Sequence, residues 1–191
     1  MKPSVLRFVQ RDYPKNSGEK YDVCYIYSCF ITFLNIKNGK KSRLKYIIRA
    51  EKYQDVFAIK FYASRDRKSV YDKYSLGHND ISITGIRQIF EFCIDVLLEI
   101  LELFPGSSFV VLGADSYNPK TQKTESSIEN QRFRIYRLFL NRRIGSETFH
   151  HFQHPSISLY LLTYKDGKND KEKSYHQIKM LLDKFELKYE E

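Results

Sequence analysis

The chain has 191 residues, of which 42% are hydrophobic and 15% aromatic, with 15 Tyr, 14 Phe and no Trp. This length fits a single domain, residues 1–191, with a core of its own, and the apolar content excludes an intrinsically disordered chain. The formal net charge is +9 and unevenly spread: residues 1–80 carry 17 basic and 8 acidic side chains and residues 116–154 carry 7 and 3, whereas residues 81–115 are acidic, with 1 and 5. A basic excess of this size favours a polyanionic partner without identifying one.

The sequence predicts a cytoplasmic protein with no cofactor and no metal. Cys24, Cys29 and Cys93 lie in apolar segments without CxxC spacing, which argues against a disulfide framework or a zinc site. The opening MKPSVLRFVQ has no apolar core followed by a small-residue cleavage site, so no secretory signal is expected. The longest apolar run, VLLEILELF, contains two glutamates and is too short to span a bilayer, so no membrane association is expected.

An antiparallel meander of three strands is predicted near the N-terminus. Residues 21–36 are rich in β-branched and aromatic residues and lack helical spacing, which indicates a long strand. The Asn38-Gly39 pair favours a tight hairpin into a second strand at 43–50, and a third follows at 56–63. The basic, polar stretch after it predicts a loop with a short strand at 74–76.

A long amphipathic helix is predicted over residues 83–104. Its apolar residues recur at helical spacing, and four acidic residues lie on the opposite side. Asn79, Asp80 or Ser82 can cap its start, and Pro105 ends it because proline disfavours helical geometry in the residue before it.

The C-terminal half predicts one strand, one helix, two strands and a final helix. The strand at 107–114 enters Gly113, and an exposed loop leads to a helix over 126–143 that a Ser126–Glu129 capping box is expected to start. Strands are expected at 148–152 and 157–164, and a terminal helix over about 172–187. Strands outnumber helices, and the first three are joined by hairpins. We therefore expect an α+β fold in two layers: a curved, mainly antiparallel sheet with about three helices packed on one face.

The helix over 126–143 contains five arginines in two classes. On a helical wheel Arg134 and Arg137 fall on the solvent side, whereas Arg132 and Arg143 fall within the apolar arc. Arg142 also falls there, but Arg142 and Arg143 close the helix and can turn outward. Because an unpaired charge in a core is costly, Arg132 needs either a buried ion pair or an anion. The acidic side of the first helix offers the arginines four carboxylates: Glu91, Asp95, Glu99 and Glu102.

An anion site is one hypothesis for this strand-Gly-loop-helix segment. The loop brings Lys120 and Lys123 near Arg132, and free backbone amides at a helix N-terminus favour a phosphate or carboxylate. With Arg134, Arg137 and Arg143, these residues form the predicted anion or nucleic-acid site. The loop has no GxxxxGK[ST] pattern, which excludes a P-loop.

Three of the five histidines, His150, His151 and His154, lie within five residues. Neighbouring residues of a strand point to opposite faces, so the three are poorly placed to ligate one metal. A metal-independent ribonuclease could still use one of them as a general base, with Tyr136 and Arg132 stabilising the phosphate.

The segments YSLGHND, SFVVLGA, NQRFRIYRLFL and HPSISLYLLTYK, with the long helix between the first two, resemble a loose group of small bacterial proteins known as domains of unknown function. The resemblance spans roughly residues 57–165 and rests on a strand ending in Gly113 and an R-x-R-x-Y helix start at Arg132, Arg134 and Tyr136. The loop after Gly113 is longer here than in that group. The resemblance implies a recurring scaffold and no activity.

Three functions follow as hypotheses. The first is a binding or regulatory module that engages an acidic protein or nucleic acid through the basic N-terminal strands and the helix over 126–143. The second is a small metal-independent ribonuclease or phosphodiesterase. The third is a structural subunit that forms a homodimer or larger homo-oligomer through an exposed apolar sheet face.

Overall fold

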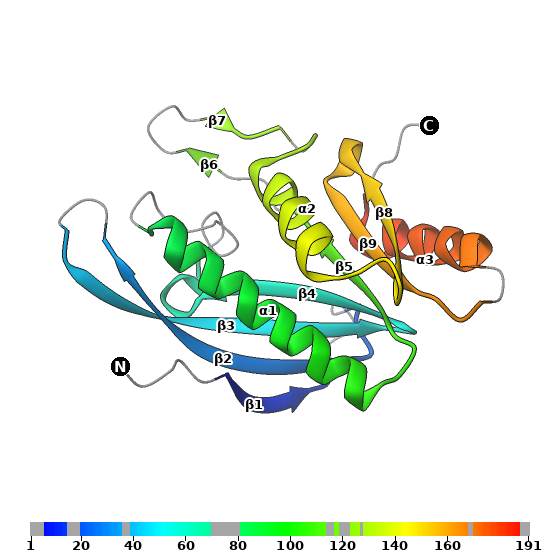
Figure 1. Ribbon diagram of the computed structural model, residues 1–191, viewed down its shortest axis with the longest axis horizontal. Helices are drawn as coiled ribbons and strands as arrows, with labels where there is room; N and C mark the ends of the chain where they lie inside the picture. The colour runs from blue at the N-terminus through cyan, green and yellow to red at the C-terminus, as the bar shows by residue number, and fades with distance from the viewer. Residues whose placement is uncertain are drawn as a thin grey trace.

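A computed structural model of the chain describes residues 6–14, 20–35, 39–69, 81–113, 117–118, 123–126, 128–167 and 170–187. It is a sheet with helices on both faces (Figure 1). The strands are β1 (Arg7–Asp12), β2 (Val23–Leu34), β3 (Lys41–Tyr53), β4 (Val56–Ala63), β5 (Ser108–Leu112), β6 (Tyr117–Asn118), β7 (Lys123–Thr124), β8 (Phe149–His154) and β9 (Leu159–Tyr164). The helices are α1 (Ile83–Leu103), α2 (Gln131–Arg143) and α3 (Asp170–Phe185), with short 3-10 turns η1 (Ser64–Asp66) and η2 (Pro155–Ile157).

Seven strands form one sheet in the order β1-β2-β3-β4-β5-β9-β8, and β6 and β7 form a separate small hairpin. Every neighbouring pair in the large sheet is antiparallel except β4 and β5, which α1 connects. The parallel pairing is short, running only from Val56–Ser108 to Ala58–Val110. The α+β class, the mainly antiparallel sheet and the three helices are confirmed.

The long β2 and β3 strands form the most regular part of the sheet, with pairing from Val23–Lys52 to Leu34–Lys41. Their hairpin includes Gly39 with φ of +65°, a backbone conformation that glycine adopts without strain. Asn38 and the strand predicted at 74–76 lie outside the described residues. β1 was not predicted, because its sequence RFVQRD is mostly exposed at the sheet edge and shows no alternating pattern.

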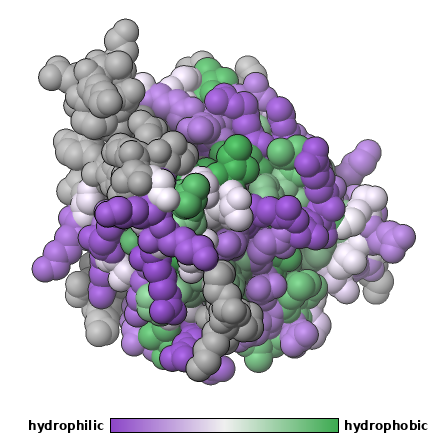
Figure 2. All heavy atoms as spheres, turned by 60° about the vertical axis from the view of Figure 1, so that its left-hand side comes forward, coloured by the Kyte–Doolittle hydropathy of each residue, from purple (hydrophilic) through white to green (hydrophobic). Residues whose placement is uncertain are grey.

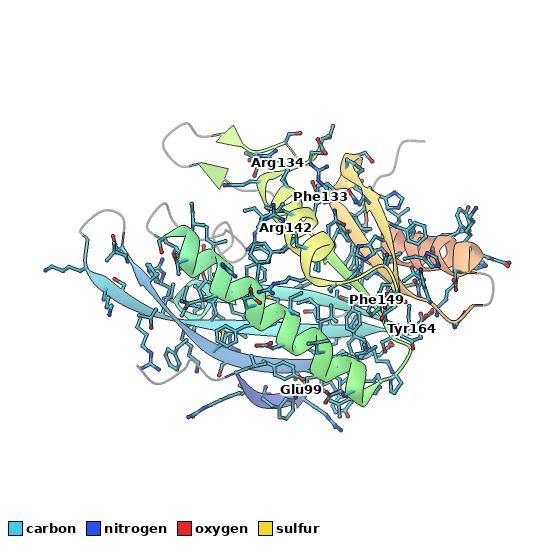
Figure 3. All side chains as sticks on the ribbon, in the orientation of Figure 1. Glu99, Phe133, Arg134, Arg142, Phe149 and Tyr164 are labelled. Carbon is cyan, nitrogen blue, oxygen red and sulfur yellow. The ribbon has the colours of Figure 1, made fainter. Side chains whose placement is uncertain are left out.

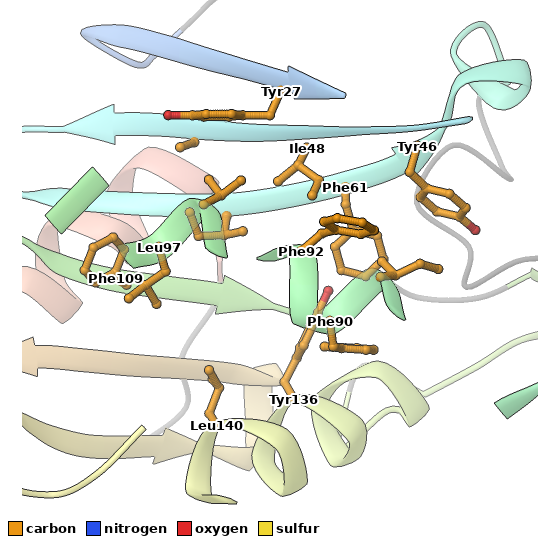
Figure 4. Packing of buried hydrophobic residues seen from close by; sticks show 14 of the residues in the cluster. Tyr27, Tyr46, Ile48, Phe61, Phe90, Phe92, Leu97, Phe109, Tyr136 and Leu140 are labelled. Atoms are coloured by element: carbon orange, nitrogen blue, oxygen red, sulfur yellow. The ribbon is translucent and has the colours of Figure 1, made fainter. Parts of the chain in front are cut away.

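The helices cover the sheet unequally. α1 and α2 lie on one face, where alternate residues such as Tyr27, Ile48 and Phe61 form the larger core (Figure 4). α3 lies on the opposite face, where Leu181 packs against Val110 and its neighbours. The molecule therefore has a third layer, which the expectation of helices on one face did not include.

α1 starts as predicted, because the Ser82 hydroxyl accepts a hydrogen bond from the Gly85 amide at 3.4 Å. Gly85 also lets the helix approach the sheet closely, since a Cβ there would lie 2.9 Å from the Phe33 Cβ. The Gln88 side chain also ties α1 to β2. Its Oε1 accepts a hydrogen bond from the Thr32 amide, and its Nε2 donates one to the Thr32 carbonyl.

Candidate anion-binding sites

The start of α2 differs from the prediction. Asn130, not Ser126, caps the helix: its Oδ1 accepts from the Phe133 amide at 2.9 Å, and its Nδ2 donates to the Gly113 carbonyl at 2.7 Å. The capping-box prediction is wrong because Glu129 adopts a φ of +45° just before the cap and cannot serve as a helical residue of the first turn. Gly113 permits this arrangement, since a Cβ there would lie 2.1 Å from the Asn130 Oδ1.

The α2 N-terminus has few free amides for a bound anion. The Gln131 amide donates to the Glu125 carboxylate at 2.6 Å, and the Asn130 amide donates to the Ser158 hydroxyl at 3.0 Å. The negative charge that a helix N-terminus favours is thus supplied by Glu125 of the same chain. Two of the amides that the predicted phosphate site could use are thus engaged within the chain. Lys120 and the Lys123 side chain lie outside the described residues, although the Lys123 backbone belongs to β7.

The outer arginines of α2 are largely engaged with carboxylates of the same chain. Arg137 pairs with Glu129 at 2.9 Å, and Arg134 donates to the Glu129 carbonyl at 2.6 Å. Arg143 pairs with Glu91 of α1, as the acidic side of that helix predicted. Arg142, labelled with Arg134 in Figure 3, is exposed and forms no ion pair with the described residues. Because of these contacts, most of the α2 arginines are not free to bind an external anion in the way that the sequence suggested.

Arg132 is the exception. Its side chain is only 2% exposed, and no described carboxylate pairs with it. The guanidinium lies over the Phe61 ring, with 4.9 Å from Cζ to the ring centroid, and the Tyr136 ring packs against the same Phe61. Nε and Nη2 have no hydrogen-bond partner among the described residues. The sequence left two interpretations open for Arg132, a buried ion pair or a bound anion. The described residues provide no carboxylate for the ion pair.

Two tyrosines adjoin this guanidinium. Tyr136 points from α2 toward Phe61 and Phe90, and Tyr46 lies beside them on β3 (Figure 4). Burial raises the pKa of Tyr46 and of Tyr136 to about 12, against the opposing charge of Arg132. Both hydroxyls therefore stay protonated, and the Tyr46 hydroxyl is buried with no hydrogen-bond partner in the described part of the chain.

The predicted histidine cluster is divided by the sheet. His151 faces α2, and its Nδ1 lies 2.7 Å from the Tyr160 hydroxyl, which donates to Asn141. His150 faces α3, where its Nε2 lies 2.7 Å from Asp170. His154 shares the His150 side of β8, four residues farther along the strand. No recorded contact joins a histidine to Arg132 or Tyr136, so the ribonuclease constellation is not brought together in the described part of the chain.

A second basic region lies on the sheet itself. Along β3, Lys41, Arg43 and Lys45 are exposed on the face opposite α1, and Arg7 of β1 lies on the same face. None of the four forms an ion pair with a described residue. Two exposed apolar side chains of the neighbouring β2 lie beside them. Phe30, at 37% exposure, is in register with Lys45, and Leu34, at 55%, is in register with Lys41. We call these six residues the basic sheet face: Arg7, Phe30, Leu34, Lys41, Arg43 and Lys45.

The geometry within the basic sheet face is specific. Phe30 pairs in register with Lys45, and the Arg43 guanidinium lies 4.1 Å from the centroid of the Phe30 ring. Farther along the sheet Arg49 and Lys60 both pair with Glu51, at 2.9 and 2.6 Å, so these two cations are engaged with a carboxylate of the same chain. Burial acts to raise the pKa of Glu51, but these two cations outweigh it and hold the carboxyl ionised.

Figure 2, seen from the side of the β2–β3 hairpin, shows hydrophilic residues interspersed with hydrophobic ones. The charge count had placed the basic excess in this part of the chain. It could not identify Phe30 and Arg43 as partners, because their contact depends on the register between two strands.

Within the described ranges, no group of three or more histidine, cysteine or acidic residues has the geometry of a metal site, and no helix has the length and apolarity to cross a bilayer. Comparison of the chain with protein-family models, curated proteins and solved structures finds no match.

Proposed function

We propose that the protein is a binding module that engages single-stranded nucleic acid through the basic sheet face. The observation that supports this best is the group of four exposed cations, Arg7, Lys41, Arg43 and Lys45, which lack ion pairs to described residues and lie on the same face of the sheet. Because phosphate contacts by lysine and arginine supply most non-specific nucleic-acid affinity, this arrangement suits a polyanion.

The spacing of the cations supports an extended ligand. Alternate residues of a strand lie about 6.8 Å apart, so Lys41, Arg43 and Lys45 place three positive charges along roughly 13 Å of β3. A single strand that follows β3 can contact all three with successive phosphates. Arg7, two strands away, widens the positive surface across the sheet.

Phe30 and Arg43 favour nucleic acid over an acidic protein. The guanidinium stacked on Phe30 presents a second planar surface, and unpaired bases stack on arginine planes and aromatic rings. An acidic peptide would use the charges but gain little from this stack. The α2 arginines play no part in the proposed surface, because their charges are largely paired.

The test compares two double variants that lose the same charge. Arg43→Ala/Lys45→Ala removes half of the cations of the basic sheet face, whereas Lys171→Ala/Lys179→Ala removes two exposed lysines from α3. We expect the first to weaken binding of a fluorescent single-stranded oligonucleotide by about tenfold or more, because a charge-assisted hydrogen bond contributes about 1.5–3 kcal/mol. The α3 variant should bind as the wild type does.

Equal weakening in both variants would mean that only the total charge matters and would overturn the assignment to this face. Polyglutamate serves as the competing probe. If it binds the wild type as tightly as the oligonucleotide at the same salt concentration, the partner is an acidic protein rather than nucleic acid. Circular dichroism of each variant checks that the fold is retained.

A further inference from the structure

We propose that Arg132 and Tyr46 form a buried binding site for one carboxylate group, separate from the basic sheet face. The site lies between β3, β4 and the first turn of α2, in the core that α1 and α2 share. Its ligand is a small monoanion, and the proposal does not depend on nucleic-acid binding.

The unpaired atoms of Arg132 are those that bind a carboxylate in parallel. A guanidinium has five N–H bonds, and the Nε and Nη2 atoms that lack acceptors carry three of them. One N–H of each atom points along the same edge, the edge that forms two parallel hydrogen bonds to two oxygens. Phe61 supports the plane of the guanidinium, and Tyr136 packs against the same ring, so this edge is held within the packed core.

The neighbouring Tyr46 and Cys93 are neutral and can donate hydrogen bonds to an oxyanion. The Tyr46 hydroxyl is fully buried, stays protonated and has no partner. The nearby Cys93 thiol also stays protonated, because burial raises its pKa. The Asp66 carboxylate, which acts to raise the pKa of Tyr46, forms its ion pair with Arg65, at 3.5 Å from the Arg65 Nε. A buried guanidinium and a buried hydroxyl that both lack acceptors are complementary to an oxyanion.

Charge and size select a carboxylate. One guanidinium neutralises one negative charge, whereas phosphate carries nearly two at neutral pH and would leave an excess charge in the core. A small cavity of about 20 Å³ is lined by Phe61 and Tyr136 and by other apolar side chains, but not by Arg132 or Tyr46. With so little free volume in this part of the core, the proposed ligand class is a short-chain aliphatic carboxylate.

The experiment observes the guanidinium directly. In the ¹⁵N-labelled wild-type chain, the Nε–H signal of Arg132 is assigned by its absence from Arg132→Met, and acetate, butyrate and phosphate are titrated at constant ionic strength. We expect saturable shifts of this signal with acetate or butyrate and weaker ones with phosphate. The Nε–H signal of Arg142, exposed on the same helix, should not move.

Two results would overturn the proposal. An Arg132 Nε–H signal that no carboxylate moves would do so, and so would one already hydrogen-bonded in the ligand-free chain, which would mean that an internal acceptor fills the site. Tyr46→Phe should weaken acetate binding while keeping the buried packing, and Arg132→Lys should weaken it by about tenfold or more, because lysine lacks the planar fork. Neither variant should change oligonucleotide binding, so this proposal and the proposed function fail independently.

Discussion

Replacing Arg132 by methionine should stabilise the ligand-free protein, the opposite of what most core substitutions do. The native side chain gains a cation–π contact of at most about 2 kcal/mol. Against this, a buried and incompletely bonded cation costs several kcal/mol in desolvation. Methionine keeps the apolar stem against Phe61 and removes the charge. We expect the free energy of unfolding to rise by roughly 1–4 kcal/mol, the range found when buried ionic groups are replaced by apolar ones.

The assay is urea denaturation followed by circular dichroism, in a buffer free of carboxylates. A domain of this size gains about 2–4 °C in Tm per kcal/mol, so thermal scans provide a second readout. Arg142→Met, at an exposed position of the same helix, should change stability by less than about 0.5 kcal/mol. A loss of about 3–5 kcal/mol in Arg132→Met would refute the reasoning, because a loss of that size is typical of breaking a satisfied buried ion pair.

Three further predictions concern the core. Gly113→Ala should destabilise the fold by about 1–3 kcal/mol in urea denaturation, because the new Cβ would displace Asn130 and with it the α2 cap. Burial lowers the pKa of His151, so the unfolded chain takes up the proton first as the pH falls. Stability should therefore decrease from about pH 7 to pH 5.5, and His151→Gln should reduce that slope. Cys24 and Cys29, whose thiol pKa values burial raises to about 12, should react with a thiol reagent at neutral pH only after urea unfolds the chain.

The elements with strong local patterns could be predicted from the sequence. The long helix at Ile83–Leu103, its Ser82 cap and the β2–β3–β4 meander follow from periodicity, capping chemistry and turn residues. The order of the C-terminal strands could not be predicted, because β9 pairs with β5 through contacts far apart in sequence. The cap of α2 was misplaced for a similar reason: Asn130 is selected by its contact with Gly113, and Ser126–Glu129 is a local pattern that lacks such a contact.

The same distinction, between local patterns and contacts far apart in sequence, applies to the candidate sites. The helical wheel located Arg132 in the apolar arc, and the acidic side of α1 supplied Glu91 for Arg143. The lack of an acceptor at Arg132 depends on which side chains of β3 and β4 meet it, and no spacing in the sequence encodes that. The Phe30–Arg43 stack likewise depends on the strand register.

The most direct test of the central claim is the salt dependence of oligonucleotide binding. If the four cations of the basic sheet face each neutralise one phosphate, log K should fall with log salt concentration with a slope of about −2.8, and with about −1.4 for Arg43→Ala/Lys45→Ala. The slope of Lys171→Ala/Lys179→Ala should match that of the wild type. Absence of binding at low salt, or a slope that Arg43→Ala/Lys45→Ala leaves unchanged, would contradict the account.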